Sequence, residues 1–103
     1  MYVSLFLWLF MCNFSWSAKF SWNKYKKKNQ QWYCSTEGRQ IADNILSWQD
    51  QYGSWPKNND SSAAPFFGDH NKLKGTFDNK ATTGEMRFLA KAYRATGEVR
   101  YKQ

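Results

Sequence analysis

Two stretches of helical periodicity, separated by a long connection, limit the folds that are open to this chain of 103 residues. In the first stretch, Ser35 or Thr36 is a suitable N-cap and Glu37 favours the first turn. Large apolar residues then recur at spacings of four, three and four and form one helical stripe: Ile41, Ile45, Trp48 and Tyr52. We expect this helix to end at Tyr52, because Gly53 suits the left-handed position after a helix.

The second stretch begins with a helix-start signal. Thr82 and Glu85 form a Thr-x-x-Glu capping box, and Gly97 would end the helix. Between them lies a second apolar stripe, made of Met86, Leu89 and Tyr93. Two amphipathic helices on either side of one connection predict an all-α fold.

The connection, Gly53 to Ala81, is too long for an ordinary loop of a compact domain and is therefore expected to be functional or disordered. Large or rigid residues argue against disorder throughout it: Trp55, Pro65, Phe66, Phe67 and Phe77. The small polar residues 59–64 are the expected mobile tip.

Two short segments of this connection carry candidate binding groups. In the first, Pro56 holds Trp55 and Lys57 in a defined relation. The second, Gly75 to Asn79, offers the carboxylate of Asp78 and the amide of Asn79 just ahead of the second helix. An aromatic ring, a cation, a carboxylate and an amide in one loop suit an acidic sugar and a metal ion. The alternative is structural: Trp55 would only brace the loop, and Asp78 and Asn79 would form a turn.

The net charge of +7 is concentrated at one end of the chain. Five lysines precede residue 30, where there is no acidic residue, whereas ten Lys and Arg are nearly balanced by eight Asp and Glu after it. A basic face spanning the body is therefore not expected, which argues against a nucleic-acid partner.

The first 17 residues form a hydrophobic leader. The apolar run of residues 1–11 is shorter than the ~20 residues that span a bilayer, and small residues at Ser15 and Ser17 suit a signal peptidase. We interpret 1–17 as a signal peptide of a secreted or periplasmic protein with no stable membrane partner beyond this leader. The lysines that follow, rather than precede, the run leave an uncleaved anchor as the alternative. Residues 18–31 are expected to form a basic, flexible linker.

The two cysteines and the single histidine are not expected to form an internal disulfide or a metal site. Cys12 lies in the leader, so Cys34 has no partner for an internal disulfide once the leader is removed. The same count excludes a cysteine metal cluster, and His70, the single histidine, is expected to be a solvated loop residue.

From Trp32 to Gln103 the chain resembles the start of the catalytic domain of pectate lyases of polysaccharide lyase family ten. Five segments in order carry the resemblance: residues 41–46 with Gln49, Gly53-Ser54-Trp55-Pro56-Lys57-Asn58, Thr76 to Thr83, Arg87-Phe88-Leu89-Ala90, and Ala95-Thr96-Gly97. The family more often has two glycines at positions 53–54 and often glycine at position 80.

The resemblance implies the first helices of an incomplete α/α toroid and cleavage of polygalacturonate by β-elimination with Ca²⁺. It implies that Asp78 is the catalytic and metal-binding carboxylate, and we assign Trp55, Lys57 and Asn79 to substrate binding. The resemblance also implies that the base is an arginine from a later part of the domain. Because the sequence stops as another element begins at Glu98, residues 32–103 are expected to be an inactive fragment, and we expect a monomer. The alternative is a non-catalytic module that binds acidic glycans or a cell surface.

Overall fold

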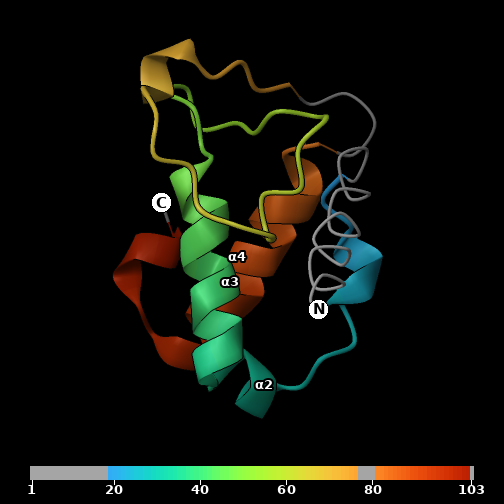
Figure 1. Ribbon diagram of the computed structural model, residues 1–103. Coiled ribbons are helices and arrows are strands. Elements are labelled where there is room, and N and C mark those ends of the chain that lie inside the picture. Colours follow the sequence, from blue (N-terminus) through green and yellow to red (C-terminus); the bar gives the residue numbers. More distant parts are fainter. Residues whose placement is uncertain (1–18, 77–80, 103) are drawn as a thin grey trace, which may run out of the picture.

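The computed structural model describes residues 19–76 and 81–102, which form a helical bundle (Figure 1). The described elements are η2 (Trp22–Lys24), α2 (Gln30–Cys34), α3 (Thr36–Ser47), η3 (His70–Lys72), α4 (Thr83–Thr96) and η5 (Val99–Lys102). Helices α3 and α4 lie side by side, with α2 against both and the long connection at one end of the pair. The predicted all-α class is confirmed, and the toroid stays a prediction.

Helix α3 begins as predicted but ends earlier. The Ser35 Oγ accepts a hydrogen bond from the Gly38 N–H at 3.1 Å, which caps the helix. The helix stops at Ser47 rather than at Tyr52, because the Asp50 carboxylate takes the backbone N–H groups of Tyr52 and Ser54 at 2.9 Å each. Such side-chain bonds offer the backbone an alternative to helical bonds.

The early end of α3 turns Tyr52 out of the predicted stripe. Its side chain is 84% exposed rather than packed in the core. Gly53 still adopts the expected left-handed conformation, with a φ of 88°, but it does so in a turn after the helix.

Helix α4 begins and ends where the sequence predicts. The Thr82 N–H donates to Glu85 Oε1 at 2.8 Å, and Gly97 closes the helix with a φ of 74°. Of the predicted stripe, Leu89 is buried and Tyr93 half-buried, but Met86 is exposed.

The described part of the predicted flexible linker, residues 19–31, is packed against the helices. Tyr25 is buried, its hydroxyl donates to Ser62 Oγ at 2.9 Å, and its ring lies edge-on to Phe88 of α4. Figure 1 shows this segment (blue) beside α4. The expectation of a loose arm is therefore wrong for these residues, because their aromatic side chains supply the apolar area that holds them in place.

The core lies between these elements and consists mainly of aromatic and small apolar residues: Tyr25, Tyr33, Ala42, Ile45, Trp55, Phe88, Leu89, Ala92 and Tyr101. Gly38 allows α2 and α3 to approach closely, since a Cβ there would lie 2.9 Å from the Tyr33 Cα. The Cys34 thiol donates to the Ala95 carbonyl at 3.1 Å, so this cysteine also bridges elements of the bundle.

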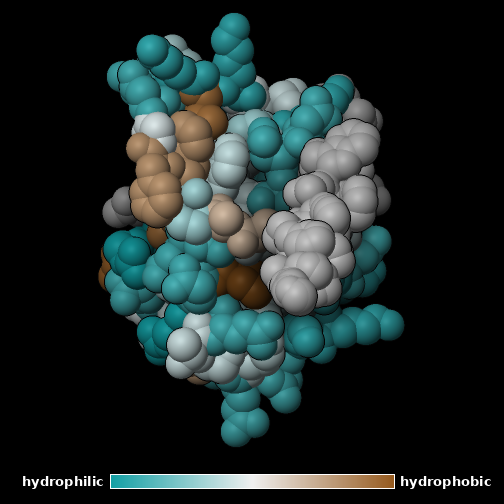
Figure 2. All heavy atoms as spheres, viewed as in Figure 1, coloured by the Kyte–Doolittle hydropathy of each residue, from teal (hydrophilic) through white to brown (hydrophobic). Residues whose placement is uncertain are grey.

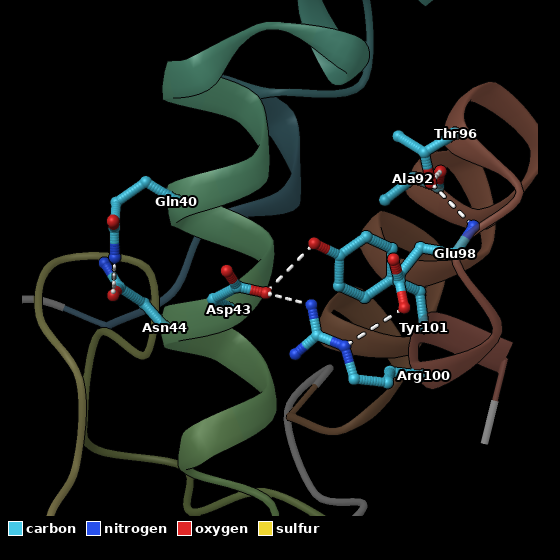
Figure 3. Close-up of polar contacts among 8 residues, drawn as sticks. All are labelled: Gln40, Asp43, Asn44, Ala92, Thr96, Glu98, Arg100 and Tyr101. Atoms are coloured by element: carbon cyan, nitrogen blue, oxygen red, sulfur yellow. Dashed lines mark hydrogen bonds and ion pairs between the residues drawn. The ribbon is translucent and has the colours of Figure 1, made fainter.

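The C-terminal element is tied to α3 by polar contacts (Figure 3). Asp43 Oδ1 accepts a hydrogen bond from the Tyr101 hydroxyl at 3.0 Å and forms an ion pair with Arg100 at 3.1 Å. Arg100 also pairs with Glu98 at 3.2 Å. These contacts fix η5 against the bundle.

The molecular surface in Figure 2 is largely hydrophilic, with hydrophobic atoms gathered over the segment just before η3. There Phe67 is 90% exposed, and Phe66 is half-buried with its ring 5.0 Å from that of Trp48. Among the described residues, no helix combines the length and the apolar character needed to cross a membrane.

Candidate functional site

The described parts of the two candidate segments meet at Trp55 and Thr76. Trp55 and Thr76 form an antiparallel bridge, in which the Thr76 N–H donates to the Trp55 carbonyl at 2.9 Å. The Trp55 N–H donates to Thr82 Oγ1 at 2.7 Å, and that hydroxyl donates to the Thr76 carbonyl at 2.7 Å. The Thr82 side chain at the start of α4 therefore holds Trp55 and Thr76 together.

Asp50 organises the same region from the other side. Its Oδ2 accepts from Ser54 Oγ at 2.8 Å and from the Gly75 N–H at 2.9 Å, in addition to the two bonds that Oδ1 accepts. Burial acts to raise the pKa of Asp50, but the hydrogen bonds from Ser54, Gly75 and Tyr52 outweigh it and lower the pKa. The carboxylate is thus ionised and fully engaged in holding the loop.

Gly75 is needed where the two segments meet. A Cβ at this position would lie 2.7 Å from both the Ser54 carbonyl carbon and the Trp55 nitrogen. Backbone atoms cannot move aside as the end of a flexible side chain can, so a larger residue would push the segments apart.

Thr82 has a strained backbone at the point where the connection enters α4. Its φ of 71° and ψ of −47°, with a hydrogen bond of 2.7 Å from the Thr83 N–H to the Ala81 carbonyl, define a γ-turn. A β-branched residue at positive φ costs about 1–3 kcal/mol and persists only where its surroundings hold it. Here the bonds to Trp55, Thr76 and Glu85 hold it.

Glu85 is a buried carboxyl below this turn, with 2% of the residue exposed. Burial raises its pKa to about 7, and the charge of Asp60 adds to this effect, while backbone N–H groups of Glu85 and Thr82 oppose it. The group that supports the γ-turn therefore titrates near neutral pH.

Trp55 is a core residue. The residue is 1% exposed, and its indole N–H donates to the Ile45 carbonyl at 2.7 Å. This corrects the expectation that Trp55 contacts a sugar ring, because the indole has no open face in this conformation. Of the two roles that the sequence leaves open, this burial favours the bracing role.

Lys57 is half-buried and follows Pro56 on the first segment. Asp78 and Asn79 lie outside the described residues, so their predicted roles stay predictions. Among residues 19–76 and 81–102, no group of three or more His, Cys, Asp or Glu side chains is gathered to hold a metal ion. His70 is exposed, as predicted, and its Nδ1 lies 3.0 Å from the Gln49 carbonyl.

The sequence reasoning missed the roles of Asp50 and Gly75 and the loop contacts of Thr82. Asp50 stands two residues before Tyr52 in a turn-rich run that ends in Gly-Ser, a pattern typical of an Asx-turn. That signal was available in the sequence. The clamp by Thr82 was not, because its partner Trp55 lies 27 residues away.

The part of the sequence that forms the long connection and α4 matches a known protein family. The model of the pectic acid lyase family matches residues 49–103, just over half of the chain, and so includes both candidate segments. The chain belongs to the pectic acid lyase family. Comparisons with curated proteins and with solved structures gave no match.

Proposed function

We propose that this protein takes part in calcium-dependent cleavage of polygalacturonate by β-elimination and that the long connection binds the polymer. The family membership supports a pectate lyase function. The single structural observation that carries the proposal is the Trp55–Thr76 bridge. Lys57 and Asp78 each follow a bridged residue by two positions, so the bridge supports the proposal that these two residues act at one site.

Calcium, when bound between the protein and a uronate carboxylate, would make the proton on the adjacent carbon more acidic. The described residues do not supply a complete calcium site, and Asp50 is occupied by hydrogen bonds. Calcium takes six to eight oxygen ligands. We therefore assign Asp78 as one protein ligand and leave the other positions to substrate oxygens and to residues outside this set.

The other side chains have separate roles. Lys57 pairs with a uronate carboxylate as a point charge, and the Asn79 amide binds substrate next to Asp78. Trp55 is a positioning residue that holds Lys57 in place from the core. None of these residues is assigned as the base, so we expect this chain alone to bind polygalacturonate without turnover.

The test measures oligogalacturonate binding by calorimetry with calcium and with a chelator, together with ultraviolet absorbance of any unsaturated product. We expect calcium to tighten binding and Asp78→Asn to abolish the calcium effect. Glu37→Gln, at an exposed carboxyl of α3, is the matched control and should keep it. Equal binding with calcium and chelator, without any unsaturated product, would refute the proposal.

We also propose that residues 1–17 direct secretion, because the apolar run of residues 1–11 and the small residues Ser15 and Ser17 suit a cleaved signal peptide. Fusing these residues to a reporter enzyme and measuring its export tests this directly. A reporter that stays inside the cell would contradict it. We propose a monomer as the binding form, which light scattering checks.

A further inference from the structure

Two hollows flank the contact between the N-terminal segment and α4, and both are lined by cations. The first, of about 400 Å³, is lined by Lys26 and Arg87 with the rings of Phe20 and Trp22. The second, of about 440 Å³, is lined by Lys28, Lys91 and Arg94. No acidic residue lines either hollow.

The cations come together because of the fold. Arg87, Lys91 and Arg94 lie four and three residues apart on α4 and so share one face of the helix. Lys91 Nζ donates to the Lys26 carbonyl at 2.8 Å and to that of Lys28 at 3.5 Å, which fixes the N-terminal segment beside this face. We call the five residues Lys26, Lys28, Arg87, Lys91 and Arg94 the basic band.

Among the described residues, no member of the basic band forms an ion pair with an acidic side chain. The ion pairs of the described residues join Arg100 to Asp43 and Glu98 and involve no member of the band. Glu85, the acid on α4, is buried. Glu37 and Asp60 line a third hollow together with Lys24 and Lys28, so Lys28 is a member of the band with acidic neighbours. Arg87 and Arg94 are both exposed. The band therefore presents positive charge that an anionic partner would neutralise.

We infer that the basic band is a second, calcium-independent binding surface for a uronic acid polymer, made of residues other than Lys57, Asp78 and Asn79. Guanidinium groups bind carboxylates through two parallel hydrogen bonds, and the rings of Phe20 and Trp22 offer an apolar wall to a sugar. Cations beside aromatic rings suit a chain of acidic sugars. The choice of a uronate polymer among polyanions rests on the proposed function.

The test compares two double variants that remove the same charge. Arg87→Gln with Arg94→Gln alters the band, whereas Arg39→Gln with Lys72→Gln alters exposed cations of α3 and η3. Binding of oligogalacturonate is measured with a chelator present. We expect the band variant to bind about tenfold more weakly and the control less than about twofold. Binding should also weaken as salt is raised.

Three results would overturn the inference: equal loss in both double variants, no loss in the band variant, or tighter binding of a single-stranded oligonucleotide of equal charge. Thermal unfolding followed by circular dichroism shows that each variant is folded. Asp78→Asn separates this surface from the proposed active site, because it should remove the calcium effect and leave the binding that persists with chelator. Failure of one proposal is thus distinguishable from failure of the other.

Discussion

Replacing Glu85 by Gln tests how the start of α4 is held. In the wild-type protein the pKa of Glu85 is about 7, compared with an ordinary value of 4.5, because the carboxyl is buried. The folded state therefore holds a proton that the unfolded state has lost between these pH values, and the free energy of unfolding falls as the pH rises through this window. The difference in pKa corresponds to about 3 kcal/mol.

Glu85→Gln keeps an oxygen that accepts from the Thr82 N–H but cannot ionise. We expect its stability to be nearly independent of pH between 4.5 and 7. Above pH 7 it should exceed that of the wild type by about 1–3 kcal/mol, since the new amide hydrogens need acceptors and offset part of the gain.

Urea unfolding at a series of pH values measures this difference, with Glu37→Gln as an exposed control that should follow the wild type. The burial argument would be refuted by a wild-type protein whose stability does not change across the window. A Gln variant that is less stable than the wild type at pH 8 would refute it as well.

Two further substitutions test the loop. Asp50→Asn should lower the free energy of unfolding by about 1–3 kcal/mol, because the buried carboxylate accepts four hydrogen bonds and the amide would have no negative charge to strengthen them. Because the pKa of Asp50 is lowered, its ionised carboxylate contributes to the free energy of unfolding above the ordinary value of 3.8, and this contribution is lost as the pH falls below it. The stabilities of wild type and variant, measured by urea unfolding, should therefore converge at low pH. A difference that stays constant with pH would contradict this. Trp55→Phe should cost about 1–3 kcal/mol through the lost bond to the Ile45 carbonyl and a small cavity. If Trp55 braces the loop, calorimetry on the folded variant should give nearly unchanged oligogalacturonate affinity, and a large loss would restore a direct contact with sugar.

Features that depend on neighbours along the chain could be predicted from the sequence. The start of α4 rests on a bond between Thr82 and Glu85, three residues apart, and its end on the freedom of Gly97 to adopt a positive φ. The caps and periodic apolar residues of both helices work in the same way. The order of motifs also indicated the family, and the family match then showed it.

Features whose partners are remote in sequence depend on long-range contacts and could not be predicted in this way. Tyr25 packs the N-terminal segment through a bond to Ser62, 37 residues away, and Trp55 turns inward because Ile45 and Thr82 take its two N–H groups. Helix α3 stops at Ser47 because Asp50 holds a loop that returns at Gly75. Local patterns predict where a helix begins, but burial and long-range hydrogen bonds decide which aromatic side chains face the core and which face the solvent.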